Sequence, residues 1–428
     1  MISISISFLV LLSVGAPIAF CIGISALAGL IQLGDIPLLL IPHMMFEGTD
    51  SFPLLAVPFF VLAGALMNAG GITRRLVNFA NLLVGHVRSG LALVNVVASM
   101  FFAGVTGAAV ADTSAIGSVL IPAMKEEGYD LDFSAAITAA SSTMGPIIPP
   151  SIPMIIYGVS AEQSIGALFL AGIIPGLLIG LALMAVAYFN KGQPQGRAGQ
   201  LREATSCRSL LLGGKDAILA LFMPAFILGG ILAGIFTPTE AAAVSVLYAF
   251  FVGRFVYKEL SWRQLPALMQ ESLVVTAVIM FIIAKAAIFG WLVAALQLPQ
   301  KIIALFTAGI SSRWLILILI NFFLLLVGTF METTASLIIL TPVLLPLAKQ
   351  IGLDPIHFGA IMVLNLVIGL TTPPLGVCLF VSSGIAGISL ERISRAMIPF
   401  LLAAIVVLLL VTYIPSLSMW IPQLYLQR

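Results

Sequence analysis

Two stretches of the sequence combine hydroxyl groups, glycine and paired prolines inside apolar surroundings. They are residues 141–151 (SSTMGPIIPPS) and residues 369–374 (GLTTPP). Proline has no backbone N–H to continue a helix, so each stretch predicts a broken helix with freed carbonyl oxygens. Such carbonyls are not tolerated against lipid and must line a cavity or bind a ligand. Uncharged oxygens of this kind suit Na⁺, and the N-termini of the half-helices suit a carboxylate.

Each broken helix is preceded by an apolar stretch with a cluster of small residues at its centre. Residues 90–123 are interrupted by GVTG at 104–107, and residues 314–348 are interrupted by GTFMET at 328–333. Both stretches fit a helical hairpin that enters the membrane and returns on the same side. The sequence therefore predicts two re-entrant hairpins, followed by broken helices over 133–161 and 356–385.

The two hairpin–helix units are copies of one another. A shift of 224 residues aligns residues 104–151 with residues 328–376, with one inserted residue. The matches include glycines, prolines and charged residues, and so many of these do not coincide by chance in an apolar sequence. They pair Gly104 with Gly328, Pro122 with Pro346, Lys125 with Lys349, Asp130 with Asp354, Gly145 with Gly369, and Pro149-Pro150 with Pro373-Pro374. Simple helix kinks would not explain two matched sites.

The composition requires a membrane environment. Of the 428 residues, 61% are hydrophobic and only 8% are charged, whereas about 25% of a soluble protein is charged. So few charges cannot cover a soluble surface, and the same values exclude a disordered chain. The net charge of +2 offers no basic surface for nucleic acid. The three cysteines and three histidines are isolated, so neither a disulfide framework nor a metal cluster is expected.

The sequence predicts an all-α polytopic membrane protein with about 10–11 spanning helices besides the two hairpins. The expected spans cover residues 53–70, 133–161, 165–189, 217–236, 238–257, 271–296, 356–385 and 397–417. Residues 2–33 are interrupted at residues 15–17 (GAP) and form either one tilted helix or two short ones. This N-terminus lacks a basic region and a cleavage site, so it is expected to stay in the membrane rather than act as a signal peptide.

Lysine and arginine define the expected orientation, because they favour the cytoplasmic side. Placing the polar loop 190–216 in the cytoplasm puts 14 basic residues inside and 4 outside. Five spans lie between the two copies, so the first hairpin opens to the cytoplasm and the second opens outward. This is an inverted-topology repeat, the architecture of many secondary transporters. Residues 72–88 are too polar to span and are expected to form an amphipathic helix along the cytoplasmic interface.

Four charged residues are expected at or near membrane depth, where charges are usually functional. Glu240 ends the sequence Thr237-Pro-Thr-Glu240, which has the pattern of a capping box, so a structural role is favoured. Asp112 follows the first hairpin tip and either holds the tip or approaches Na⁺. Glu332 lies at the second tip, and a functional role is favoured. Lys285 has no acid near it in the sequence and faces a partner subunit, a cavity or an acid on another helix.

The sequence lacks several motifs that would indicate an enzyme or a channel. The chain has no HExxH, no GxSxG and no phosphate-binding GxxxxGK[ST] motif, so neither an enzyme nor an organic cofactor is expected. A passive channel is not favoured, because the sequence has no motif that resembles a selectivity filter. Inverted halves favour a carrier that alternates between inward and outward shapes.

The residues around the first hairpin resemble a known family. The segment LLAVPFFVLAGALMNAGGITRR, followed by GAAVADTSAIGSVLIPAMKEEGYDLDFSAAITAASSTMGPIIPPS, closely resembles the large membrane subunit of TRAP (tripartite ATP-independent periplasmic) transporters. The likeness covers essentially the whole chain. It implies Na⁺-coupled import of an organic acid across the bacterial inner membrane. It also implies two partner proteins, a small four-helix membrane subunit on a separate chain and a periplasmic substrate-binding protein. The lipid bilayer surrounds the membrane subunits.

By resemblance, the fold is similar to that of the divalent-anion/sodium symporters, which move substrate by an elevator mechanism. The transport domain would comprise residues 89–189 and 313–417, and the scaffold residues 1–88 and 217–300, with loop 190–216 between the halves. A stand-alone sodium/anion symporter of that fold is the alternative function. The substrate stays open between sialic acid and C4-dicarboxylates, because the binding protein does most of the selecting.

The resemblance also suggests where ligands bind. One Na⁺ site is expected between the first hairpin tip and the first broken helix, at Ser99, Gly104, Thr106, Ser142, Gly145 and Pro146. A second is expected at the matching place in the other copy, at Gly328, Thr329, Glu332, Gly369 and Thr372. The candidate substrate-binding residues are Asp112, Ser141, Thr143 and Thr371.

Overall fold

Helices form all the regular structure in the part of the chain that the computed structural model describes. That part comprises residues 6–8, 10–11, 14–34, 36–37, 39–87, 89–190, 207–297, 300–301 and 312–426, and for residues 207–212 and 426 it is limited to the backbone. The all-α prediction is therefore confirmed.

The helices are named in chain order. They are α2 (Ile18–Leu33), α3 (Leu40–Thr49), η1 (Phe52–Leu55), α4 (Ala56–Ala69), α5 (Ile72–Val84), α6 (Gly90–Thr106), α7 (Ala109–Glu126), α8 (Leu131–Ser142), α9 (Ile152–Ala161), α10 (Ile165–Phe189), α11 (Cys207–Leu232), α12 (Pro238–Phe251), η3 (Val252–Val256), α13 (Leu265–Ala295), α15 (Arg313–Phe330), α16 (Thr333–Gln350), α17 (Pro355–Gly369), α18 (Val377–Ala386), α19 (Leu390–Tyr413) and α20 (Ser416–Leu426).

Eight of the described helical segments are long and apolar enough to cross a membrane singly. They are η1 with α4, α10, α11, α12 with η3, α13, α15, α16 and α19. Five shorter apolar helices accompany them: α2, α6, α9, α17 and α18. The chain is thus a multi-span helical membrane protein, and the shorter helices are the ones that the sequence predicts as parts of hairpins, broken helices or the interrupted N-terminal stretch.

At the positions of the two predicted hairpins, the chain forms helix–turn–helix units that turn by different means. In the first, α6 and α7 meet at Gly107, whose φ of +63° is readily adopted by a residue without a side chain. In the second, α15 and α16 meet at Met331-Glu332. The Glu332 carboxylate caps α16 by accepting a hydrogen bond from the Ala335 N–H at 3.1 Å.

Both predicted broken helices are present, and the first half of each is buried. The first is α8 followed by α9, and the second is α17 followed by α18. Every residue from Phe133 to Ser142 and from Ile356 to Gly369 is buried. Because a break leaves backbone groups that lipid cannot satisfy, burial inside the protein is what the bilayer requires.

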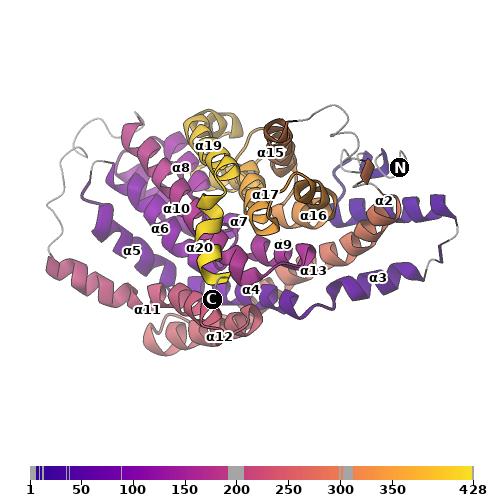
Figure 1. Ribbon diagram of the computed structural model, residues 1–428. Coiled ribbons are helices and arrows are strands. Elements are labelled where there is room, and N and C mark those ends of the chain that lie inside the picture. The colour runs from indigo at the N-terminus through magenta and orange to yellow at the C-terminus, as the bar shows by residue number, and fades with distance from the viewer. Residues whose placement is uncertain are drawn as a thin grey trace.

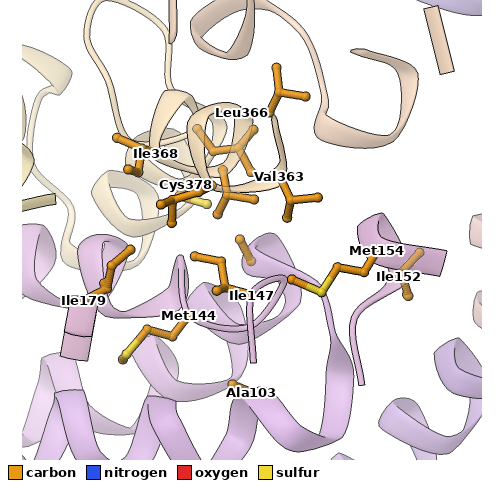
Figure 2. Close-up of a cluster of buried hydrophobic side chains, with 14 of the residues drawn as sticks. Ala103, Met144, Ile147, Ile152, Met154, Ile179, Val363, Leu366, Ile368 and Cys378 are labelled. Carbon is orange, nitrogen blue, oxygen red and sulfur yellow. The ribbon is translucent and has the colours of Figure 1, made fainter. Parts of the chain in front are cut away.

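The two copies pack into one block, here called the repeat block, made of α6–α10 and α15–α20. α16 of the second copy packs against α9 of the first, and α18 of the second packs against α7 and α8 of the first. Figure 2 shows this boundary: Met144 and Ile147 of the first copy lie opposite Leu366 and Cys378 of the second. Each copy therefore completes the core of the other.

Hydrogen bonds and an ion pair reinforce the same boundary. The Ser382 hydroxyl of α18 donates to the Ala135 carbonyl of α8 at 2.7 Å. Near the ends of α8 and α19, the Arg392 guanidinium contacts both carboxylate oxygens of Asp132, at 2.8 and 3.0 Å. The exposed ion pair contributes little, whereas the buried hydroxyl fixes the register of the two helices.

The remaining helices form a second layer beside the repeat block. α4 packs against α12, α11 against α5 and α12, and α13 against α4. In Figure 1, α11, α12 and α4 follow the lower edge of the molecule, and α2 and α3 lie with α13 at one end. The layer reaches the block through α5, which leads into α6, and through α13, which packs on α16.

Several predicted boundaries differ from the structure. The interfacial helix expected over 72–88 ends at Val84, because the chain turns at Gly85, where a Cβ would lie 2.1 Å from the Asn81 side-chain oxygen. The loop expected over 190–216 is helical from Cys207 on, and residues 191–206 lie outside the described part. A turn at residues 14–15 precedes α2, so the stretch 2–33 contains two helical segments, with some of its residues outside the described part.

Two helices were not predicted at all, and one predicted detail is confirmed. α3 and α20 have 10 and 11 residues, which is too short for the length rule that identifies spans. The capping box at the start of α12 is present: the Thr237 side chain accepts from the Glu240 N–H, and the Glu240 carboxylate accepts from the Thr237 N–H. Glu240 is thus a capping residue, as the sequence indicates.

Candidate functional site

A cavity of about 720 Å³ lies between the repeat block and the second layer. The second layer contributes α4 and α13 to its lining, and the repeat block contributes α6, α7, α9, α16 and α18. Thr106 and Gly107 line it from the first hairpin tip, and Glu332 and Thr333 line it from the second. Both tips therefore reach the same cavity, although they belong to different copies of the repeat.

Four helices begin at this cavity. Ala109, Ile152, Thr333 and Val377 line it and are the first residues of α7, α9, α16 and α18. The N–H groups of a first helical turn lack acceptors within the helix and carry a partial positive charge. Among the described lining residues there is no lysine or arginine. The starts of α7, α9 and α18 are thus the positive groups that this lining presents to a ligand, whereas the N-terminus of α16 is capped by the Glu332 carboxylate.

At the first tip, Asp112 connects the hairpin to the first broken helix. Its Oδ1 accepts a hydrogen bond from the Thr106 hydroxyl. Its Oδ2 lies 2.1 Å from the position that a Cβ on Gly145 would take, so only glycine leaves room for it. Asp112 is fully buried, and Oδ2 has no hydrogen-bond partner among the described residues. A buried carboxylate of this kind needs a proton or a cation to offset its charge.

Other oxygens of the first predicted Na⁺ site gather beside Asp112. The Ser142 carbonyl lies 3.3 Å from the same Cβ position on Gly145, and the buried Ser142 hydroxyl donates to the Thr138 carbonyl at 2.7 Å. Pro146 follows directly and lines the cavity. The structure thus brings together four of the six predicted residues, namely Thr106, Ser142, Gly145 and Pro146, and adds Asp112 to them.

The other two residues predicted for this site lie elsewhere. The Ser99 hydroxyl donates to the Ser141 hydroxyl at 2.9 Å, and Ser141 donates to the Asn95 side-chain oxygen at 3.0 Å. This buried network ties α6 to α8 below the tip. Gly104 packs against the second layer, because a Cβ there would lie 2.6 Å from Pro224 of α11.

The second predicted Na⁺ site brings two glycines into direct contact. A Cβ on Gly369 would lie 2.5 Å from the carbonyl carbon of Gly328, so the hairpin and the broken helix touch through their backbones. The Thr329 hydroxyl donates to the Leu325 carbonyl, and the Thr372 hydroxyl donates to the Ile368 carbonyl, each at 3.0 Å. Glu332, the fifth predicted residue, caps α16 at the edge of the cavity.

The four predicted substrate-binding residues lie behind the cavity rather than in its lining. Asp112 and Ser141 are engaged in the contacts given above. The Thr143 hydroxyl donates to the Ala140 carbonyl at 2.6 Å, and the Thr371 hydroxyl donates to the Ile368 carbonyl at 2.9 Å. The side chains of Thr143 and Thr371 thus point back onto the helices that precede them.

Sequence reasoning missed several polar residues of the lining. The sequence predicts a span that starts at Glu271, but α13 begins at Leu265, so the Glu271 carboxylate lies within the helix and on the cavity. Thr333 and Thr334 also line the cavity, and they belong to the GTFMETT run that marks the second tip, so the sequence carried a signal for them.

The donors at both sites are oxygens. Within the described residues, no group of three or more His, Cys, Asp or Glu side chains is placed to hold a metal ion. Hydroxyls, carbonyls and single carboxylates are the donors that hard cations prefer.

Comparison with known proteins identifies the family. A family model for the DctM component of tripartite ATP-independent periplasmic (TRAP) transporters matches residues 5–417. The chain belongs to this family. The large permease protein SiaM of a sialic acid TRAP transporter from Vibrio cholerae is 43% identical over 416 residues, which cover 97% of each protein. The large permease protein DctM of a C4-dicarboxylate TRAP transporter from Pseudomonas aeruginosa is 44% identical over 378 residues, 88% of each.

Two further comparisons concern length and fold. An isethionate TRAP transporter permease protein, DctMQ from Oleidesulfovibrio alaskensis, is 43% identical over 96% of this chain, which spans 65% of that relative's length. The crystal structure of the YdaH transporter from Alcanivorax borkumensis superposes with a TM-score of 0.62, covering 89% of this chain and 87% of that one, at 14% identity. This likeness shows a shared transporter fold.

Membership of the TRAP family confirms the resemblance that the sequence shows. The chain is a transporter permease rather than an enzyme, and it is a multi-pass protein of the bacterial inner membrane.

Proposed function

We propose that this TRAP permease imports an organic acid and couples the import to Na⁺. The relatives described above are named for sialic acid, C4-dicarboxylates and isethionate, which are all organic anions. We further propose two partners, a small four-helix membrane subunit and a periplasmic substrate-binding protein. The observation that carries the proposal is the convergence of both hairpin tips and four helix N-termini on one cavity.

The first Na⁺ site lies, in this proposal, at the first tip and includes Asp112. The support is the unpartnered Oδ2, the Thr106 hydroxyl and the carbonyl of Ser142, all beside Gly145. Sodium would supply the positive charge that this buried carboxylate lacks. The second Na⁺ site would lie at the Gly328–Gly369 contact, with oxygens from Thr329 and Thr372. Direct backbone contact leaves carbonyls from two elements close enough to share one ion.

The substrate carboxylate, we propose, binds at the helix N-termini that line the cavity. Because the described lining has no lysine or arginine and Glu332 already caps α16, the partial charges at the starts of α7, α9 and α18 are the groups available to an anion. Bound Na⁺ would add to them, so that the anion binds well only after the cation. This order would couple the two gradients.

The cavity, in this proposal, faces the cytoplasm. Asn68 and Ala69 line it from the end of α4 that precedes Arg74 and Arg75, and Leu268 lines it from the start of α13. Both ends are cytoplasmic in the orientation that the basic residues favour. The hairpins would then be re-entrant, and the structure would be the inward-facing state of an elevator in which the repeat block moves past the second layer.

Proteoliposomes that contain the chain, its small subunit and its binding protein test the coupling. Uptake of the binding protein's ligand should require an inward Na⁺ gradient, should not require ATP, and should depend sigmoidally on Na⁺ because two sites are proposed. Equal uptake with choline in place of Na⁺ on both sides would contradict Na⁺ coupling. Full uptake without the binding protein would instead favour a stand-alone sodium/anion symporter.

A further inference from the structure

Glu271 is a charged residue of the cavity that the proposed Na⁺ and substrate sites do not use. It lines the cavity from α13, together with Leu268, Val275, Val278 and Ile282. These residues recur every three or four positions and therefore share one face of the helix. The exposed Glu271 side chain thus lies on the side of α13 that faces the cavity.

The Glu271 carboxylate has no counter-charge in the part of the chain that the structure describes. The ion pairs there use the carboxylates of Glu47, Asp132, Glu259 and Glu391. The described lining contains no lysine or arginine. Lys285, the other charged residue of α13, is not in the lining, and its ammonium lies 3.6 Å from the Met45 sulfur of α3. The negative charge of Glu271 is therefore available to act on a ligand in the cavity.

The stability of α13 does not account for an acid at this position. An acid stabilises a helix within its first turn, near the partial positive charge of the N–H groups. α13 begins at Leu265, so Glu271 lies beyond that turn. The residues one turn away on either side of Glu271 are apolar, namely Ala267, Leu268, Val274 and Val275. An ion pair along the helix is therefore not available to Glu271 either.

Glu271 and the groups available to an anion belong to different layers of the molecule. α13 is part of the second layer, whereas the starts of α7, α9 and α18 are part of the repeat block. Glu332, the other acid among the described lining residues, also belongs to the repeat block, where it caps α16. If the repeat block moves past the second layer, Glu332 travels with the anion site and Glu271 stays behind. The distance from Glu271 to the anion then differs between the two states of the carrier.

We propose that Glu271 weakens binding of the substrate anion when the cavity faces the cytoplasm, and thereby promotes release of the anion there. The inference rests on the proposed function, which supplies an anionic substrate and a repeat block that moves. Like charges in one cavity repel one another. The repulsion acts in the state that brings the anion site to Glu271, and it falls once the repeat block has moved away. Glu271 therefore lowers the affinity for the anion on the cytoplasmic side, and this difference between two states speeds release.

Uptake against a preloaded lumen measures the affinity of the cytoplasm-facing site. Proteoliposomes contain the chain with its small subunit, and the binding protein is added outside only, so transport is restricted to complexes whose periplasmic side faces outward. The probe is sialic acid, succinate or isethionate, whichever the unaltered complex takes up. The same anion trapped in the lumen occupies the cytoplasm-facing site and inhibits the initial rate of uptake. Glu271→Gln, which removes the charge and keeps the size, should lower the luminal concentration that halves this rate about threefold to thirtyfold.

Three controls separate the charge of Glu271 from its shape. Glu271→Asp keeps the charge and should leave the half-inhibiting luminal concentration close to that of the unaltered complex. Glu126→Gln removes an exposed acid at the end of α7, outside the lining, and should have no effect. High luminal ionic strength, set with choline chloride, screens exposed charges and should narrow the difference between Glu271→Gln and the unaltered complex. A purely structural role of Glu271 would not respond to salt in this way.

A second variant adds a charge to the same face of α13. Val278 is exposed, lines the cavity and lies two turns further along the helix than Glu271. Val278→Glu should raise the half-inhibiting luminal concentration about threefold or more, whereas the uncharged Val278→Gln should leave it unchanged. This pair decides the matter if Glu271→Gln does not assemble with the small subunit.

Half-inhibiting concentrations that are unchanged in both Glu271→Gln and Val278→Glu, with uptake still dependent on Na⁺, would overturn the inference and leave the proposed function intact. A higher concentration for Glu271→Gln would show that the carboxylate attracts the substrate, and a raised Na⁺ requirement would show that it holds the ion. Either result would also overturn the inference. Uptake of none of the three anions by the unaltered complex would contradict both the inference and the proposed substrate class.

Discussion

Asp112 is the residue that, in the proposed mechanism, decides what the first hairpin tip binds. Its carboxylate is fully buried, with Thr106 on one oxygen and the backbone at Gly145 against the other. In the bare chain the charge has no counterpart among the described residues, so the ionised form is disfavoured until a cation arrives. The same oxygen that contacts Gly145 would contact the ion. In the proposed mechanism, sodium binding and closure of the tip onto the broken helix would be one event.

Replacing Asp112 by Asn tests this role at the scale of one residue. The amide keeps the size and loses the charge, so the first site should bind Na⁺ about tenfold to a hundredfold more weakly, the effect of losing about 1.5 to 3 kcal/mol from a charged contact. Uptake in proteoliposomes should need correspondingly more Na⁺, and its dependence on Na⁺ should become less sigmoidal.

Asp132 provides the matched control for that substitution. It is also an aspartate at the start of a helix, but its partner is the exposed Arg392 at the surface. Asp132→Asn should therefore leave the Na⁺ dependence unchanged. An unaltered Na⁺ curve for Asp112→Asn would remove this carboxylate from the ion site.

At the scale of elements, each hairpin is joined to its broken helix by close approach of small groups. In the second copy the backbone of Gly328 touches Gly369, and in the first copy the space at Gly145 is filled by a carboxylate from the hairpin. Both copies thus keep a close contact between hairpin and broken helix, but the contacting groups differ. This difference predicts that the second junction depends on shape and the first on charge.

Gly369→Ala tests the junction that depends on shape. The new methyl group would lie 2.5 Å from a backbone carbon of Gly328, which cannot move aside as a side chain can. We expect a loss of about 1 to 3 kcal/mol in stability, the usual effect of overpacking, together with reduced uptake. Thermal unfolding of the purified complex measures it. Gly384→Ala, where a Cβ meets nothing within 4 Å, is the control and should be neutral or slightly stabilising. Equal melting temperatures for the two variants would show that the junction can open at no cost.

The elements that the sequence predicted are those with a local cause. Paired prolines mark both broken helices, so these breaks could be placed from residue types, whereas single prolines such as Pro122 and Pro175 lie inside continuous helices. α3 packs against α13 and α20 against α10, both distant in the sequence, and a length rule cannot find such short helices. The site follows the same division. Thr106 and Gly145 were predicted from their motifs, whereas the contact of Asp112 with Gly145 joins α7 to the end of α8 and exists only in three dimensions.

At the scale of the whole molecule, the two copies of the repeat pack against one another. Each copy packs its hairpin against the broken helix of the other, as α16 does on α9 and α7 on α18, so neither copy can move alone. The boundary with the second layer has a different character. At one point of that boundary, a Cβ on Gly290 of α13 would lie 3.9 Å from Pro342 of α16, an ordinary van der Waals distance. A small residue at such a point lets two helices pack without interlocking. We therefore expect the repeat block to move as one body against the second layer.

Paired cysteines test this expectation in a variant whose native cysteines are replaced. Ala135→Cys with Ser382→Cys joins α8 to α18 within the repeat block, where the Ser382 hydroxyl already lies 2.7 Å from the Ala135 carbonyl. Gly290→Cys with Pro342→Cys joins the block to the second layer. After treatment with a short thiol crosslinker, the first pair should keep its uptake, because the two positions travel together. The second pair should lose uptake, and a cleavable crosslinker should restore it on reduction. Each single cysteine, treated alike, controls for modification. If instead the crosslink within the block stopped transport while the crosslink to the second layer did not, the hairpins would open and close around a stationary site, and an elevator would be the wrong mechanism for this protein.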